Sequence, residues 1–415
     1  MSDSPDTPQE ATTAEDGATP LAPLLQLREG LPAVIDTSAA LTTTIDAFAS
    51  GSGPVAVDAE RASGYRYSAR AYLVQLRRAG SGTALVDPLP FPDLAELGSA
   101  ISDTEWVLHA ASQDLPCLTE VGMRPRRLFD TELAGRLLNY PRVGLASMVE
   151  ELLGYRLSKE HSAVDWSTRP LPEPWLSYAA LDVEVLAELR DVMHRQLTDA
   201  GKLGWAEEEF AALLTAAPAQ PRRDPWRRTS GIHRVRGKRA LATVRELWQE
   251  RDAIARQRDI TPSRILRDAA IVEAAMAQPA GRRELAALGG FRGRTAQRYL
   301  ARFADALASA RTLPEEELPT LVARYDGPPP AKVWVDRDPA AADRLTAARA
   351  AVGQVAEQHQ LPVENLVAPD SVRRLCWTPP EPVTEATVAE ALRGYGAREW
   401  QIGLVSPVLA AALAP

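Results

Sequence analysis

Two kinds of hydrophobic pattern occupy different parts of the chain. Short apolar runs rich in β-branched residues come first and predict strands over 54–60, 72–76, 83–87 and 106–110. Apolar residues at helical spacing follow and predict helices over 129–138, 145–154 and 175–197. Beyond residue 231 β-branched runs are scarce, and the chain is expected to be all helical. This order predicts an α/β domain with a central sheet, followed by helical domains.

Stretches that combine clustered proline with charge and lack an apolar period lie at 216–231 and 323–339. They predict a division of the chain into six parts. These are a tail over 1–20, an α/β domain over 21–215, a linker over 216–231, a first helical domain over 232–313, a linker over 314–339 and a second helical domain over 340–415.

The two helical domains share a short pattern at a fixed offset. Ala255-Arg256-Gln257, with apolar residues at 260, 265 and 266, recurs 101 residues later as Ala356-Glu357-Gln358 with apolar residues at 361, 366 and 367. Chance similarity between alanine-rich helices is the alternative. Because the repeat falls between independently placed linkers, we favour a duplicated helical domain.

Composition narrows the class of protein. The 415 residues are 45% hydrophobic and 25% charged, as in soluble globular proteins of about two to four domains. No uncharged apolar run approaches the roughly 18 residues that span a bilayer. Residues 1–20 carry five acids and no Lys or Arg, the reverse of a secretory leader, and are expected to be a solvated tail. With Cys117 and Cys376 as the only cysteines, a cytoplasmic location without membrane attachment is expected.

The net charge of −8 hides a basic region. Residues 222–311 contain 21 Lys or Arg and 9 Asp or Glu. A basic region in an acidic chain is a candidate nucleic-acid surface, with Arg236, Lys238 and Arg239 as candidate phosphate contacts. The alternative is coding bias, since 43 of the 47 basic residues are Arg. Bias explains the choice of Arg over Lys, but it does not explain why the excess is local.

Asp58 and Glu60 form a pair of acids on the first long predicted strand. Strand alternation puts Val55 and Val57 on one face and the two carboxylates side by side on the other. Like charges this close repel each other, and a cation between them removes the repulsion. Mg²⁺ and Mn²⁺ prefer such oxygen ligands. Taken alone, the pair fits a solvent-exposed strand edge better than a metal site.

Further acids follow at two places, and each has an ordinary structural explanation. Asp114 comes after the predicted strand 106–110, where it could cap a helix. Tyr178 and Asp182 lie four residues apart on one helix face, where the tyrosine could be core packing and the aspartate a surface residue. Leu181, Val185 and Leu189 mark the expected core stripe of that helix.

Together these residues resemble the three motifs of the DEDD superfamily of 3′–5′ exonucleases, in its tyrosine subclass. Asp58-x-Glu60, Asp114 and Tyr178-x-x-x-Asp182 stand in the family's order and spacing. The resemblance extends to YLVQL, to HAASQDL with His109, to FDTELAGRLL and to DWSTRPL over 165–171. The chain is similar to the ribonuclease D family, and its two helical domains resemble the HRDC (helicase and ribonuclease D C-terminal) domains of that family. The last module, with LCWTPPEP over 375–382, resembles them less well than the first.

The resemblance implies a fold and a chemistry. The fold is an RNase-H-like α/β domain, a mixed central sheet flanked by helices, followed by two all-α HRDC-type domains. Asp58, Glu60, Asp114 and Asp182 would hold two divalent ions, Mg²⁺ or Mn²⁺, in a two-metal-ion hydrolysis. Tyr178 would orient the attacking water, and His109 is expected to be structural rather than a general base.

The resemblance also implies RNA as the partner. Nucleotides would be removed from RNA 3′ ends as nucleoside 5′-monophosphates, with tRNA precursors as expected substrates. Alternatives are a DNA exonuclease of the same superfamily and an inactive nucleic-acid-binding protein, although the retained acids argue against loss of activity. Arg61, Tyr65, Arg66 and Tyr67 follow the first motif and either line a single-strand groove or form an ordinary loop.

Overall fold

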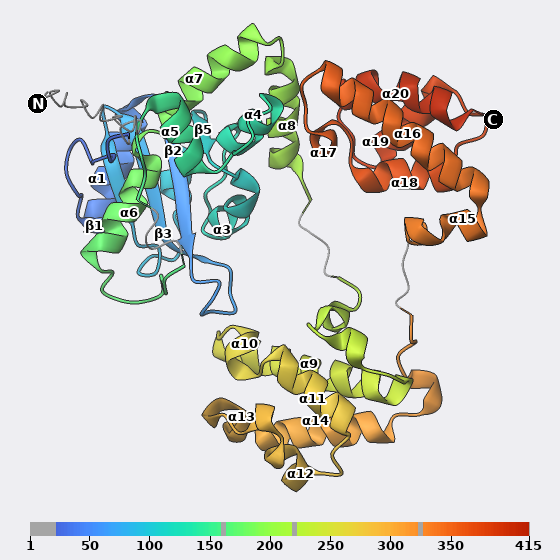
Figure 1. Ribbon diagram of the computed structural model, residues 1–415. Coiled ribbons are helices and arrows are strands. Elements are labelled where there is room, and N and C mark those ends of the chain that lie inside the picture. The colour runs from blue at the N-terminus through green and yellow to red at the C-terminus, as the bar shows by residue number, and fades with distance from the viewer. Residues whose placement is uncertain (1–21, 159–162, 218–221, 323–326, 415) are drawn as a thin grey trace, which may run out of the picture.

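The computed structural model describes residues 22–158, 163–217, 222–322 and 327–414. The expected tail over 1–20 lies outside these residues. The described chain consists of an α/β domain and two helical modules (Figure 1). In this part of the chain no helix is both long enough and apolar enough to cross a membrane.

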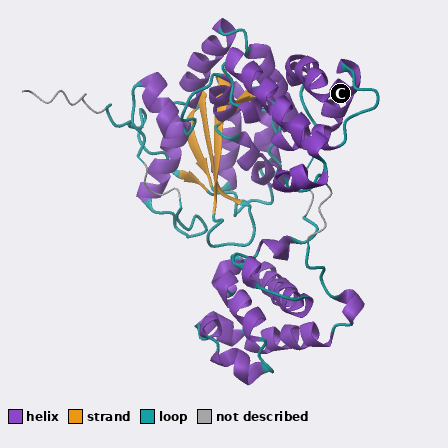
Figure 2. Ribbon diagram, turned by 45° about the vertical axis from the view of Figure 1, so that its right-hand side comes forward, coloured by secondary structure: helices purple, strands orange, loops and turns teal. Residues whose placement is uncertain are grey.

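A six-stranded mixed sheet forms the centre of the α/β domain, in the order β1-β4-β3-β2-β5-β6. Helices cover it on both sides (Figure 2). Strand β2 runs antiparallel to β3 and parallel to β5, and its residues Val55, Ala56 and Val57 are fully buried. The strands are β1 (Val34–Ile35), β2 (Ser52–Arg61), β3 (Ala71–Ala79), β4 (Gly82–Val86), β5 (Glu105–Leu108) and β6 (Arg127–Asp130).

The helices of this domain surround the sheet, and its buried apolar residues form two clusters, the smaller of which holds Leu176, Ala179 and Ala180 of α6. They are α1 (Ser38–Ser50), α2 (Ala95–Ala100), α3 (Leu115–Glu120), α4 (Thr131–Leu137), α5 (Leu145–Leu153), α6 (Glu173–Glu184), α7 (Leu186–Asp199) and α8 (Leu203–Thr215).

The four strands expected from the sequence are present. Two of the expected helices differ from the structure. The segment 129–138, expected to be a helix, begins as the end of β6, and α4 starts only at Thr131. The expected single helix over 175–197 is two helices, because Val185 has a φ of −120° and separates α6 from α7. The apolar period continues across this break, since both helices bury residues next to it, so periodicity alone does not reveal it.

The two helical modules lie apart from each other in Figure 1. The first consists of α9 (Lys238–Arg258), α10 (Pro262–Ile265), α11 (Asp268–Ala277), α12 (Arg282–Ala287), α13 (Arg294–Arg298) and α14 (Leu300–Thr312). The second consists of α15 (Trp334–Arg337), α16 (Pro339–Gln358), α17 (Val363–Leu366), α18 (Pro369–Trp377), α19 (Glu385–Gly394) and α20 (Glu399–Leu413).

The repeat seen in the sequence recurs in the elements. Helices α10 and α17 have the same length, and α17 starts 101 residues after α10. Helix α18 also starts 101 residues after α11. Asp259 and Gln360, one offset apart, follow the long helices α9 and α16 and both have left-handed backbones, with φ of 48° and 49°. The two modules therefore share a long helix, a left-handed turn and two further helices in the same spacing.

Both modules contact the α/β domain through this turn. In the first module the Asp259 carboxylate accepts hydrogen bonds from the backbone N–H groups of Tyr67 (3.1 Å) and Ser68 (2.8 Å). In the second, the Gln360 carbonyl accepts one from the Lys202 ammonium at 3.0 Å. The loop over 62–70, between β2 and β3, thus connects the strand that carries Asp58 to the first module.

The second module also shares an apolar core with the α/β domain. The Trp205 ring at the start of α8 stacks on the Trp400 ring of α20, with centroids 5.0 Å apart. The Trp400 indole N–H donates to Glu209, and Arg398 forms an ion pair with the same carboxylate at 3.4 Å. The buried contact makes the α/β domain and the second module one packed unit.

Candidate active site

Strand β2 carries the first two acids. Asp58 lies opposite Gln75 of β3 and Glu60 lies opposite Leu73, so the two carboxylates leave the same face of the sheet as the alternation predicted. The flanking residues Val57 and Ala59 are buried on the other face. The apolar half of β2 thus fixes the strand in the core and directs its acids toward α6.

Helix α6 brings the third acid to β2. Its buried residues Leu176, Ala179, Ala180 and Val183 pack it onto the sheet, where it contacts β2, β3 and β4. Asp182 and Tyr178 are partly buried on the side of α6 that faces the acids of β2, and their side chains form a hydrogen bond. Neither is a surface residue.

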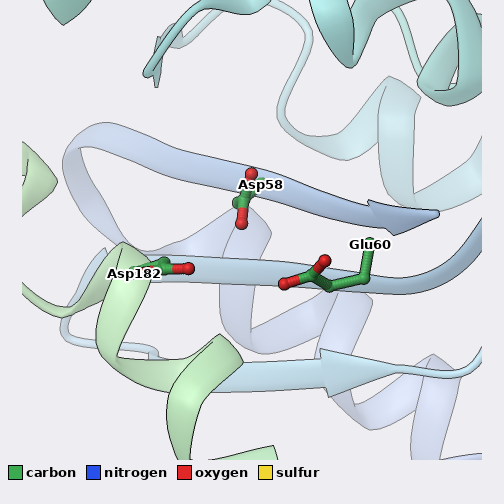
Figure 3. A group of neighbouring side chains, drawn as sticks. All are labelled: Asp58, Glu60 and Asp182. Atoms are coloured by element: carbon green, nitrogen blue, oxygen red, sulfur yellow. The ribbon is translucent and has the colours of Figure 1, made fainter. Parts of the chain in front are cut away.

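Asp58, Glu60 and Asp182 form one cluster. A carboxylate oxygen from each of the three lies within 4.8 Å of one from each of the others. Figure 3 shows the two side chains of β2 and that of α6 pointing into a common space. The packing of α6 on β2 therefore brings Asp182 close to Glu60 and Asp58, although it lies 122 residues beyond Glu60 in the sequence. One cation between the three side chains would be within reach of all of them.

The cluster is electrostatically unfavourable without a cation. Burial, followed by the charges of Asp58 and Asp182, raises the pKa of Glu60 to about 10. Burial also raises the pKa of Asp58, and burial together with the charge of Asp58 raises the pKa of Asp182. The ionised forms of all three acids are disfavoured. A bound cation would stabilise these ionised forms, so the cluster favours cation binding.

Asp114 lies close to this cluster but is held by a different partner. Its carboxylate is buried and forms an ion pair with Arg61, with Nη2 and Oδ1 3.2 Å apart. Burial, followed by the charge of Asp58, raises the pKa of Asp114 to about 8. Asp114 occupies the position before α3, yet its side chain makes no capping hydrogen bond. Helix capping therefore does not account for this residue.

Asp130, which the sequence reasoning missed, fixes the turn that carries Asp114. It is 1% exposed and accepts hydrogen bonds from the backbone N–H groups of Ala110 and Ala111, just after β5. It also accepts from the N–H groups of Glu132 and Leu133, as the N-cap of α4. The signal available in the sequence was an Asp directly before a helical period, and that signal does not reveal the second pair of bonds.

All five motif residues line one cavity of about 450 Å³. Asp58, Glu60, Asp114, Tyr178 and Asp182 line it, and Arg61 lines it with them. The first turn of α5 and Gln113 were not expected there. The full lining is Asp58, Ala59, Glu60, Arg61, His109, Ala110, Gln113, Asp114, Gly144, Leu145, Ala146, Ser147, Leu157, Ser158, Tyr178, Asp182 and Leu186.

His109 has a structural environment. Its Nδ1 lies 2.9 Å from the Thr131 hydroxyl, and that hydroxyl donates to the Leu108 carbonyl at 3.2 Å. Burial lowers the pKa of His109 to about 4. The imidazole is therefore neutral at pH 7, and it joins the end of β5 to the start of α4.

The other candidate contacts lie outside the cavity. The Tyr67 hydroxyl donates to Asp252 at 3.0 Å, and the guanidinium of Arg264 lies 4.1 Å from the centroid of the Tyr65 ring. Arg66 donates through Nε to the Ser167 hydroxyl at 2.7 Å. The loop residues Tyr65 and Tyr67 thus contact the first helical module.

Arg236, Lys238 and Arg239 lie at the start of α9, around a depression that also includes Glu315. The Glu315 carboxylate lies 3.5 Å from the Lys238 ammonium and 3.8 Å from Arg239. Arg239 also donates to the carbonyls of Ala310 and Leu313. Arg239 is therefore tied to the end of α14, and the contact of these three residues with RNA stays a prediction.

The donor set of the cavity fits divalent cations. All the ligand atoms are carboxylate oxygens, which Mg²⁺ and Mn²⁺ prefer, and they come from rigid elements rather than from loops. The three oxygens that lie within 4.8 Å of one another belong to Asp58, Glu60 and Asp182, and the charge of Arg61 offsets only part of the rise in the pKa of Asp58 and Glu60. The residues present are those that such an ion requires.

Comparison with known families and structures agrees with this geometry. The family model described as 3′-5′ exonuclease matches residues 32–198, the HRDC domain model matches 240–307, and the model described as 3′ to 5′ exonuclease C-terminal domain matches 327–413. Ribonuclease D of Acidiphilium cryptum is 34% identical over 303 residues, which are 69% of this chain and 74% of that protein.

Two solved structures resemble nearly the whole chain. A crystal structure of a protein from Bifidobacterium adolescentis is 40% identical, with a TM-score of 0.87, and the match covers 94% of this chain and 99% of that one. Escherichia coli RNase D, described as an exoribonuclease involved in structured RNA processing, is 27% identical, with a TM-score of 0.67 and coverage of 92% and 98%. The mixed sheet with flanking helices and the helical modules that follow it are confirmed, and the chain belongs to the ribonuclease D family of 3′–5′ exoribonucleases.

Proposed function

We propose that the cavity at the end of β2 hydrolyses the 3′-terminal phosphodiester of RNA with two divalent cations, Mg²⁺ or Mn²⁺. Asp58, Glu60 and Asp182 would hold one ion, and Asp58 and Asp114 would hold the other. The observation that carries this proposal is the cluster of three carboxylates within 4.8 Å, drawn from two elements that pack directly on each other.

Each group has a role that follows from its position. The ions, when bound, neutralise charge on the attacking and leaving oxygens and make water a better nucleophile at neutral pH. The acids of β2 and α6 fix the place of that chemistry, because the sheet and α6 are rigid. Leu157 and Leu186 supply apolar lining beside them.

Tyr178 positions water rather than removing its proton. Burial, followed by the charges of Asp182 and Glu60, raises the pKa of the Tyr178 hydroxyl above its ordinary value, so that it stays protonated at neutral pH. A protonated phenol that donates to Asp182 keeps its lone pairs for a hydrogen bond from water. The resemblance to the tyrosine subclass supports the same role.

We infer that the substrates include tRNA precursors or other structured RNA and that the enzyme acts in the cytoplasm. Support comes from the description of the E. coli relative and from the basic region of the first helical module. The positive charge of that region attracts a phosphate backbone without selecting a sequence.

Labelled substrates test the proposal. The full-length protein is incubated with 5′-end-labelled and 3′-end-labelled RNA, in Mg²⁺, in Mn²⁺ and in EDTA. We expect a ladder that shortens from the 3′ end, release of labelled nucleoside 5′-monophosphate from the 3′-labelled strand, and no reaction in EDTA. Shortening of the 5′ end, or equal degradation in EDTA, would contradict the proposal. DNA of the same sequence shows whether the site selects ribose.

A further inference from the structure

Arg61 enters the cavity because the β2–β3 register shifts next to it. Glu60 lies opposite Leu73, and the following pair is Arg61 with Ala71, so one residue of β3 is skipped. Regular alternation directs residues 60 and 61 to opposite faces of the sheet. Irregularities of this kind re-aim side chains and are common beside active sites. Both Glu60 and Arg61 line the same cavity.

The guanidinium is placed against one acid of the site. Its Nη2 lies 3.2 Å from Oδ1 of Asp114, whose side chain is 7% exposed, whereas the Arg61 side chain is 26% exposed. Arg61 carries the only full positive charge among the lining residues that the structure describes, since His109 is neutral at pH 7. Asp114 also stands apart from the three acids that lie within 4.8 Å of one another.

We propose that Arg61 is a tethered counter-ion that competes with a divalent cation for Asp114 and moves off this carboxylate when the ion binds. The inference rests on the proposed function of the four acids. It makes the two ion positions unequal. The position at Asp58, Glu60 and Asp182 is open to an ion, whereas the position at Asp114 is reached by displacing a guanidinium.

The exposed side of Arg61 gives the displaced group somewhere to go. Its side chain is partly in contact with solvent at the end of β2, so it can turn away while its Cα stays in the sheet. A guanidinium freed next to the ions is a suitable donor to a phosphate oxygen of RNA. Arg61 thus pairs with Asp114 when no ion is bound there, and it binds a phosphate of the RNA when the ions are bound.

Calorimetric titration of Mn²⁺ alone into the full-length protein tests the competition. We expect the weaker ion site of Arg61→Gln to bind at least about tenfold more tightly than that of the wild type. An opposite charge at this distance changes the affinity of a carboxylate for a proton by about 10- to 1000-fold, and a cation responds to the same charge. A second ion that becomes measurable only in the variant counts as this strengthening.

Matched variants identify the cause. Arg61→Lys keeps the charge and should lie between the wild type and Arg61→Gln, and it remains informative if the glutamine variant does not fold. Arg70→Gln removes the same charge from the exposed far end of the loop that follows Arg61 and should leave the titration unchanged. In an Asp114→Asn background, Arg61→Gln should have a clearly smaller effect, because its ion-pair partner is absent and only its weaker influence on Asp58 and Glu60 remains.

The inference is overturned if Arg61→Gln binds Mn²⁺ like the wild type, or if the strengthening persists undiminished with Asp114→Asn. Failure of the underlying function looks different. In that case the wild type itself would bind no Mn²⁺ saturably, or its binding would be the same in Asp58→Asn.

Discussion

At the residue scale, the site consists of negative charges that the fold holds together at a cost. The hydrophobic half of β2 and the packing of α6 place Asp58, Glu60 and Asp182 within ligand distance of one another. Burial, followed by the charge of Asp58, raises the pKa of Glu60 and of Asp182, so the arrangement disfavours its own ionised form. A site of this kind has high affinity for cations because an ion relieves repulsion that already exists.

Tyr178→Phe separates water positioning from ion binding. The ring keeps its packing on α6 and loses only the hydroxyl that bonds to Asp182. We expect Mn²⁺ affinity within a few-fold of the wild type and turnover lower by about 10²-fold, the usual scale for loss of one catalytic group. Single-turnover rates at saturating Mn²⁺ measure the effect, and an unchanged rate would rule out the positioning role.

The raised pKa values predict how the ion-free protein responds to pH. The pKa of Asp114 rises from an ordinary 3.8 to about 8 and that of Glu60 from 4.5 to about 10, so between these limits the folded chain binds more protons than the unfolded chain. Stability must then fall as pH rises through this window. Urea unfolding in EDTA at pH 5, 6, 7 and 8 should show this fall.

Two comparisons test the cause of the pH effect. Asp114→Asn should reduce the slope of stability against pH, because one of the protonated acids is gone. Saturating Mg²⁺ should reduce it as well, since the ion replaces the proton. A slope that is the same in wild type and variant would show that other groups cause it.

Part of this site could be predicted from the sequence, and part could not. Strand alternation places Asp58 and Glu60 on one face, and the order of the motifs relates them to Asp182. The Arg61–Asp114 pair depends on a register shift, which arises from how two strands meet and leaves no local pattern in either one. Asp130 was missed because a capping signal says nothing about a neighbouring turn.

At the element scale, the loop over 62–70 joins the site to the first helical module. It leaves the end of β2 directly after the motif acids. Its backbone N–H groups contact Asp259 of the turn that follows α9, and the Tyr67 hydroxyl contacts Asp252 on α9 itself. The Thr261 N–H donates to the Tyr65 carbonyl at 3.0 Å, which adds a main-chain link. The sequence suggested aromatic and cationic residues here but did not show that another module is their partner, because that contact joins residues about 190 positions apart.

Asp259→Gly tests this junction. Glycine tolerates the left-handed backbone at this position, so the change removes the carboxylate without straining the turn. Hydrogen bonds to a charged acceptor contribute about 1.5–3 kcal/mol each, so the amides of Tyr67 and Ser68 should exchange hydrogen at least about tenfold faster. Hydrogen-exchange mass spectrometry of the loop measures this.

Asp305→Asn is the matched control, because Asp305 is an exposed acid of the same module on α14. It should leave exchange in the loop unchanged. Equal protection of the loop in wild type and Asp259→Gly would mean that the aspartate does not hold the two bodies together.

At the scale of the whole molecule, the two helical modules join the α/β domain in different ways. The second shares a continuous apolar core with it, including the stacked Trp205 and Trp400. The first has its own core and meets the α/β domain mainly through the polar contacts of one loop. A protein truncated after residue 217 would lack both helical modules, and the apolar core at α8 would be exposed to solvent. RNA binding by the basic first module is therefore better tested by substitutions in the full chain.

Arg236→Gln with Lys238→Gln provides this test. If both residues contact phosphates, affinity for a structured RNA falls, and the slope of log affinity against log salt becomes shallower by about 0.7 per contact on single strands. Short oligonucleotides that reach only the cavity should be hydrolysed as before. Filter binding across a salt series decides between contact and coding bias, since residues that make no contact leave affinity and slope unchanged.

The most direct test of the central claim is the rate at which Asp58→Asn releases nucleoside 5′-monophosphate from 3′-labelled RNA in Mn²⁺, with the melting temperature in EDTA as the check on folding. The substitution removes one charge from the centre of the acid cluster and keeps the shape of the side chain. We expect the rate to fall by more than about 100-fold while the ion-free protein melts at the same temperature or higher, because repulsion is relieved. A folded Asp58→Asn protein that releases monophosphate at the wild-type, Mn²⁺-dependent rate would contradict the assignment of the active site.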